Sequence, residues 1–206
     1  MPNSEQSVLN LTLDYSPNFT PNRARTEFLI IHHTGGKSAD TAFGSAVDWL
    51  GRKEAMASAH FVIPRRMSNI VQMVRLEDKA WHAGRSSWVL DGKPVTGLNS
   101  YAIGIELAGN GNRWEYTDFQ YAALAAICID LIFPEYPHLA DPERILGHEQ
   151  ISPGRKVDPG RMFDWRRFYK SLEEGGDIFA MDLKEESEED DRADDGWPEW
   201  LGARPA

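Results

Sequence analysis

Short apolar runs alternate along this chain with segments of helical periodicity, and this alternation constrains the fold more than any other feature. Residues 28–31 and Ala102–Leu107 have the length and the β-branched content of buried strands, and 145–148 is a shorter run of the same kind. Residues 60–63 and 70–74 are expected to pair as two strands across a turn. Strands that alternate with helices predict a single α/β domain, in which a central mixed sheet is flanked by helices.

Helical spacing and capping residues mark the segments between these strands. The expected helices are 40–55, 118–133 and 164–172. Asp40 is the expected N-cap of the first helix, and Thr117 with Gln120 forms a capping box before the second. Residues 1–26 and 80–100 are rich in turn residues or glycine and are expected to be loops. A loop as long as 80–100 inside a compact domain is usually functional or disordered.

Charge is unevenly distributed, with a boundary near residue 173. The 206 residues include 22 basic and 32 acidic side chains, a formal net charge of −10. Residues 173–206 contain 13 acidic and 3 basic residues, which accounts for the whole excess. We therefore expect three regions: an N-terminal extension at 1–26, a folded domain at 27–172 and an acidic, disordered tail at 173–206. The neutral folded region argues against nucleic-acid binding, which requires a basic face.

Cysteine content and hydropathy bear on where the chain is made. Its single cysteine, Cys128, lies in an apolar helical pattern, so an internal disulfide is impossible and a buried thiol is expected. No basic segment followed by an apolar one begins the chain, so no signal peptide is expected. Apolar runs are far shorter than the roughly 20 residues that span a bilayer. We expect a monomer that is made in the cytoplasm and does not insert into membranes.

Two histidines and one aspartate form a candidate metal site. His32 and His148 each end a predicted strand, and strand ends are where ligands bind in α/β sheets. Asp158 follows His148 by ten residues. Two imidazoles and one carboxylate leave a fourth position open for water, which is the arrangement of a catalytic zinc. On the residues alone, a structural role for either histidine stays open.

Four motifs occur along the chain in an order that a known family shares. They are 30–34 (Ile-Ile-His-His-Thr), 81–84 (Trp-His-Ala-Gly), 103–107 (Ile-Gly-Ile-Glu-Leu) and 147–160, which runs from Gly-His to Lys-Val-Asp-Pro-Gly. From about residue 16 to residue 172, the chain resembles the zinc-dependent N-acetylmuramoyl-L-alanine amidases. The AmpD type, which has aspartate as its third zinc ligand, is the most similar. Amidase-type phage lysozymes and peptidoglycan-recognition proteins are related to this family.

This resemblance implies a role for each matching residue. It makes residues 27–172 a zinc amidase catalytic domain, with Zn²⁺ as cofactor. The implied zinc ligands are His32, His148 and Asp158, the implied catalytic residues are Glu106 and Lys156, and the implied substrate contacts are Trp81, His82, His60, Arg85 and Asn99. Because neighbouring side chains of a strand point to opposite faces, His33 is expected to face away from the zinc.

The implied reaction is hydrolysis of the amide bond between N-acetylmuramic acid and L-alanine in peptidoglycan or in a muropeptide. The enzyme would serve as an endolysin that reaches the wall after holin-type release, as a particle-borne bacteriolytic enzyme, or in the processing of cytoplasmic muropeptides. One alternative is a peptidoglycan-binding module on the same scaffold that does not cut. Another is a regulator that acts through its acidic tail or its surface. The tail itself is either a solubilising extension or a segment in which Trp197 and Trp200 dock onto the domain or a partner.

Overall fold

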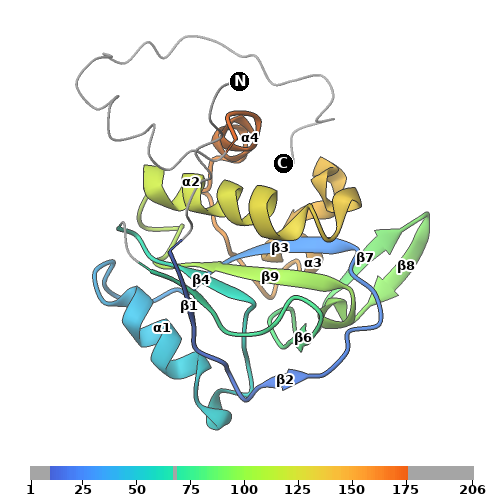
Figure 1. The fold of residues 1–206 in the computed structure, drawn as a ribbon, viewed down its shortest axis with the longest axis horizontal. Helices are drawn as coiled ribbons and strands as arrows, with labels where there is room; N and C mark the ends of the chain where they lie inside the picture. The colour runs from blue at the N-terminus through green and yellow to red at the C-terminus, as the bar shows by residue number, and fades with distance from the viewer. Residues whose placement is uncertain (1–9, 67–68, 176–206) are drawn as a thin grey trace, which may run out of the picture.

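The computed structural model describes residues 10–66 and 69–175, in which a six-stranded sheet lies between helices (Figure 1). The strands are ordered β1-β5-β4-β9-β3-β10 across the sheet. Their bounds are Leu11–Leu13 (β1), Phe28–His33 (β3), Phe61–Ile63 (β4), Ile70–Gln72 (β5), Ala102–Leu107 (β9) and Ile145–Gly147 (β10). All neighbouring pairs are parallel except β4 and β5, so the sheet is mixed, as the sequence predicts.

Helices cover both faces of this sheet (Figure 1). The helices are α1 (Ala42–Leu50), α2 (Asp118–Ile127), α3 (His148–Ile151) and α4 (Trp165–Glu173). Helix α2 packs on one face with α4 beside it, and α1 packs on the other face against Val62 and Val71. The α/β fold class predicted from the sequence is confirmed.

Side-chain alternation along β3 determines which residues reach the candidate site. Leu29 and Ile31 are fully buried in the cluster under α2 and α4, whereas Ile30 packs in the cluster on the opposite face. His32 therefore shares the face of Ile30. Since β3, β9, β4 and β10 are mutually parallel, their carboxyl ends meet at one edge of the sheet, and β3 presents His32 there.

The helix bounds differ from the sequence predictions at several ends. Helix α1 begins after Thr41 rather than Asp40, and no side chain caps it. It ends at Leu50, and a separate 3₁₀ turn follows at Lys53–Ala55. The capping box of Thr117 and Gln120 is confirmed. Helix α2 ends at Ile127, and the predicted continuation forms a π-helical turn, Cys128–Ile132, in which the cysteine is buried as expected.

Two segments predicted as loops contain strands. Within 80–100, β7 (Ser87–Leu90) and β8 (Lys93–Thr96) form an antiparallel hairpin. Asp91 and Gly92 both have positive φ at its tip, which is the backbone of a type I′ hairpin turn. Within 1–26, β1 adds a parallel edge strand, and β2 (Phe19–Thr20) pairs with β6 (Lys79–Ala80).

Some predictions fall outside the described residues. Residues 176–206 are not described, so the expected acidic tail and the docking of Trp197 and Trp200 stay predictions. The expected boundaries near 26 and 173 also stay predictions. Across 10–66 and 69–175, none of the helices is long and apolar enough to cross a membrane.

Candidate active site

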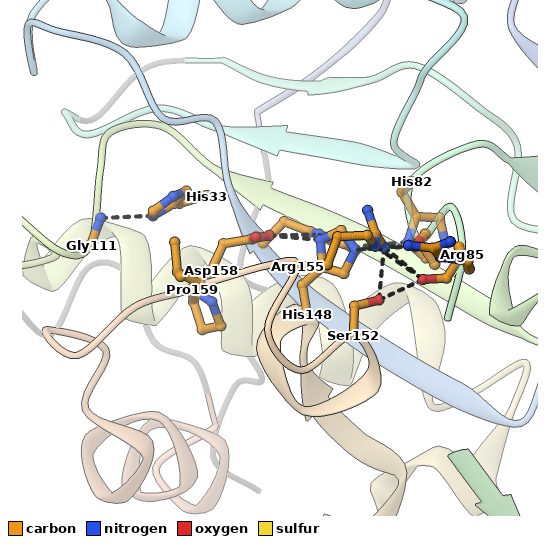
Figure 2. Close-up of polar contacts among 12 residues, drawn as sticks. His33, His82, Arg85, Gly111, His148, Ser152, Arg155, Asp158 and Pro159 are labelled. Carbon is orange, nitrogen blue, oxygen red and sulfur yellow. Dashed lines mark hydrogen bonds and ion pairs between the residues drawn. The ribbon is translucent and has the colours of Figure 1, made fainter. Parts of the chain in front are cut away.

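Three side chains of the predicted metal site, His32, His148 and Asp158, converge at the carboxyl edge of the sheet. Figure 2 labels His148 and Asp158. Nδ1 of His32 lies 2.9 Å from Nδ1 of His148 and 3.0 Å from Oδ2 of Asp158. Nδ1 of His148 lies 2.9 Å from the same carboxylate oxygen. All three residues are buried. Among the described residues, their ligand atoms lie close enough together to hold a metal ion.

Each of these side chains is delivered by a different element. His32 comes from β3, and His148 is the first residue of α3, directly after β10. His148 was predicted to end a strand, whereas β10 stops one residue earlier, at Gly147. Asp158 lies in the loop after α3, and its carbonyl oxygen accepts a hydrogen bond of 2.9 Å from the backbone N–H of Glu149, which fixes this loop against the helix.

The donor chemistry of this group fits a zinc ion. Nε2 of His148 lies 3.1 Å from the carbonyl oxygen of Ala83, and a carbonyl can only accept. With a metal ion on Nδ1, the proton of this ring would be on Nε2 and would donate to that carbonyl. Burial lowers the pKa of His32 to about 4, so this imidazole is neutral at neutral pH. Two imidazole nitrogens and a carboxylate oxygen within 3 Å of one another are a suitable ligand set for Zn²⁺.

An open pocket of about 320 Å³ lies over this group. This volume is at the lower end of the range for small-molecule sites. Of the residues implicated by the sequence, the pocket is lined by His32, His82, Glu106, Trp81, His148, Lys156 and Asp158. Leu50, Ala57 and Val157 add apolar surface to the wall.

Glu106 has an unusual environment for a carboxyl group. It sits on β9 directly opposite His32, and its Oε2 is buried without a hydrogen-bond partner among the described residues. Burial, together with the negative charge of Asp158, raises the pKa of Glu106 to about 8. The positive charge of Lys156, which also lines the pocket, opposes this shift. A carboxyl with a pKa near neutrality is suited to exchanging a proton during catalysis.

Three of the predicted substrate contacts do not line the pocket. His60 is fully buried, and its Nδ1 accepts a hydrogen bond of 2.9 Å from the backbone N–H of Gly104. Asn99 accepts hydrogen bonds from the backbone N–H groups of His82 and Ala83. Arg85 contributes its carbonyl oxygen, which accepts from Ser152 Oγ and from Arg155. The geometry gives these three residues supporting contacts, and their assignment to substrate stays a prediction.

His33 and Arg155 complete the surroundings of the pocket (Figure 2). Nδ1 of His33 accepts a hydrogen bond of 2.9 Å from the N–H of Gly111, and His33 makes none of the contacts that join the three candidate ligands. Arg155 also lines the pocket and was not predicted as a site residue. Arg155 directly precedes the predicted catalytic residue Lys156, and this position in the sequence could have indicated that it lies at the site.

Comparisons with known proteins agree with this geometry. A profile of the N-acetylmuramoyl-L-alanine amidase family matches residues 22–161. The chain is 37% identical over 172 residues to the 1,6-anhydro-N-acetylmuramyl-L-alanine amidase AmpD of Haemophilus influenzae, which covers 76% of this chain and 89% of that relative. It is also 37% identical over 161 residues to AmpD of Escherichia coli, over 72% of this chain and 83% of the relative.

Solved structures lead to the same family. A crystal structure of a selenomethionine derivative of AmpD superposes with a TM-score of 0.62 at 32% identity, covering 84% of this chain and 99% of that one. AmiD from Escherichia coli, in complex with anhydro-N-acetylmuramic acid-L-Ala-D-gamma-Glu-L-Lys, superposes with a TM-score of 0.58 at 33% identity, covering 71% of this chain and 57% of that one. The chain is therefore an enzyme of the amidase class and belongs to the N-acetylmuramoyl-L-alanine amidase family.

Proposed function

We propose that this protein is a zinc-dependent amidase that cleaves the bond between the lactyl group of N-acetylmuramic acid and the L-alanine of the peptide stem. The observation that carries the proposal is the convergence of His32, His148 and Asp158 beside Glu106 in one pocket. Nδ1 of each histidine and Oδ2 of Asp158 would hold the zinc. When bound, zinc supplies a Lewis acid that polarises the amide carbonyl and lowers the pKa of water to roughly 7.

Glu106 is the proposed general base and general acid. Positive charge at the metal centre and at Lys156 favours its carboxylate form at the start of the reaction. The carboxylate takes a proton from the attacking water while the water oxygen bonds to the amide carbon. When the C–N bond breaks, Glu106 returns this proton to the departing nitrogen of L-alanine, so the carboxylate is regenerated.

Lys156 is proposed to stabilise the tetrahedral intermediate. The carbonyl oxygen gains negative charge as water adds, and a fixed ammonium beside it lowers the barrier. Lys156 lies two residues before Asp158 in the loop that lines the pocket, so the loop that holds a ligand also delivers the cation.

The favoured substrate is a soluble muropeptide with a 1,6-anhydro sugar. AmpD of Haemophilus influenzae is named for this substrate, and the alignment spans 89% of its length. The structure of AmiD carries the anhydro-muramyl tripeptide itself. The alternatives of an endolysin or particle-borne enzyme, and the cytoplasmic location and monomeric state, remain predictions.

Hydrolysis of defined substrates tests the proposal. Purified protein is incubated with anhydro-N-acetylmuramyl tripeptide or with intact sacculi, and release of stem peptides with free L-alanine N-termini is followed by mass spectrometry. We expect cleavage of the soluble substrate, loss of activity with a chelator, and recovery with zinc. Full activity of His148→Ala would overturn the metal mechanism. Zinc binding without cleavage of either substrate would favour the non-catalytic binding module, and preference for sacculi would favour the wall-lysing role.

A further inference from the structure

A single short turn, His82–Arg85, lies behind both candidate metal-binding histidines. The ring nitrogen of His148 that faces away from the ligand group, Nε2, is 3.1 Å from the carbonyl oxygen of Ala83. The equivalent nitrogen of His32, Nε2, is 2.9 Å from Nδ1 of His82. Both outer nitrogens therefore contact consecutive residues of the Trp-His-Ala-Gly motif, for which the proposed reaction provides no role beyond lining the pocket.

The contacts of His82 determine which nitrogen of His32 is free for a metal. Nε2 of His82 lies 3.3 Å from the carbonyl oxygen of Ala102, which can only accept. In neutral His82 the proton is therefore on Nε2, and Nδ1 accepts. When Nδ1 of His32 holds the metal, the proton of His32 is on Nε2, and Nδ1 of His82 is placed to accept it.

The neighbouring strand β9 leaves room for the ring of His82. A Cβ atom on Gly104 of β9 would lie 2.4 Å from Cγ and Nδ1 of the His82 ring, closer than side-chain atoms pack. Only glycine at this position lets the imidazole lie against the strand. This contact explains the glycine in the Ile-Gly-Ile-Glu motif, two residues before Glu106.

The backbone of the turn is also held in place from two sides. Oδ1 of Asn99 accepts from the N–H groups of His82 and Ala83, at 3.0 and 2.6 Å. Nη2 of Arg155 donates to the carbonyl oxygens of Ala83 and Arg85, each at 2.8 Å (Figure 2). The carbonyl oxygen of Ala83, which faces Nε2 of His148, is thus also held by Arg155.

We propose that the turn His82–Arg85 is the outer support of the metal centre, and that His82 is a positioning residue that sets the tautomer and ring orientation of His32. This inference rests on the metal site of the proposed function. Outer-shell partners of this kind typically change metal affinity by 10- to 100-fold when they are removed. The expectation that His82 contacts substrate stays a prediction, and the role toward His32 is proposed in addition to it.

Zinc affinity, rather than catalysis, tests this role. His82→Leu removes the acceptor, whereas His82→Asn retains a side-chain oxygen close to the place of Nδ1. Competition with a chromophoric chelator should give zinc binding weaker by about 10- to 100-fold for His82→Leu. His82→Asn should lie much closer to the wild type. Gly104→Ala should weaken binding in the same direction, because it displaces the ring without removing a polar group.

The control is Gly44→Ala, since a Cβ at Gly44 in helix α1 meets nothing within 4 Å. Circular dichroism and urea unfolding with chelator present establish which variants are folded. If Gly104→Ala does not fold, the two His82 variants decide the question.

The outcomes separate this inference from the proposed function. A wild-type protein that binds no zinc contradicts the proposed function itself. Zinc binding by the wild type, with equal affinity in folded His82→Leu, overturns the support role of His82 while leaving the metal site intact.

Discussion

Glu106 and His32 are register partners on adjacent parallel strands, β9 and β3, and their side chains share one face of the sheet. The pairing places a buried carboxyl oxygen without a partner beside the candidate metal ligands. Because both residues lie on strands in the middle of the sheet rather than on loops, their separation is set by the backbone hydrogen bonds of the ladder. The placement of Glu106 beside His32 therefore does not depend on the conformation of a loop.

Replacement of Glu106 should separate catalysis from metal binding. Glu106→Gln keeps the size and polarity of the side chain but cannot carry the proton. We expect kcat to fall by roughly 10²- to 10⁴-fold, which is the usual contribution of general acid–base catalysis, while one zinc per chain is retained. Kinetics on the anhydro-muramyl tripeptide and metal analysis of the same preparation provide the measurement. Wild-type kcat in this variant would remove Glu106 from the mechanism.

The raised pKa of Glu106 also predicts how stability depends on pH in metal-free protein. Folding raises this pKa from 4.5 to about 8, so between these values the folded protein holds a proton that the unfolded chain has released. The free energy of unfolding therefore falls as pH rises through this window, by at most about 1.4 kcal/mol per pH unit. Glu106→Gln lacks this contribution, and above pH 8 it should be the more stable protein.

Urea unfolding in the presence of a chelator, at pH 5, 7 and 9, measures this difference. The two proteins should converge at low pH and diverge as the solution becomes basic. A constant difference across the three pH values would show that Glu106 does not titrate between them.

Lys156 is expected to act on the transition state without holding the metal. Lys156→Met removes the charge and keeps much of the side-chain length, and kcat should fall by about 10²-fold, as when a single oxyanion contact is lost. Lys156→Arg, which retains a cation, should recover part of this loss. Both variants should bind zinc as the wild type does. A decrease confined to zinc affinity would instead place Lys156 in support of Asp158.

Local signals account for the parts of this structure that the sequence predicted well. The capping box of Thr117 and Gln120 and the apolar run of β3 depend on residues close together in the chain, and both were found. Strand β1 has three residues, two of them only partly buried, and it is held by pairing with β5, almost 60 residues away. No local pattern reveals such a pairing, because the free energy comes from distant backbone groups.

The hairpin inside 80–100 does have a local sequence signal. Asp91-Gly92 is a dipeptide typical of two-residue hairpin turns, and in the structure both residues have positive φ. The contacts that hold His82 in place have no such local signal. Nothing in the sequence shows that Asn99 holds the backbone at His82 or that Gly104 leaves room for its ring, since both depend on how β9 lies against a loop.

Removal of the acidic C-terminal segment tests whether catalysis belongs to the described domain. A chain that stops after Gly175 keeps helix α4 entire and loses 11 acidic and 3 basic residues. The pocket residues all precede this point, so hydrolysis of the soluble substrate and zinc affinity should be unchanged. A loss of either would assign the segment a part in activity, as the regulatory alternative requires.

The matched control is a chain that stops after Phe163 and so lacks α4. Phe168 of this helix is fully buried and Tyr169 nearly so, in the cluster that α4 shares with α2. Removing one buried aromatic side chain typically costs about 3–5 kcal/mol, so this shorter chain should unfold at a much lower urea concentration or fail to fold. Equal stability of the two truncated chains would mean that α4 does not belong to the core, and the folded domain would then end before residue 164.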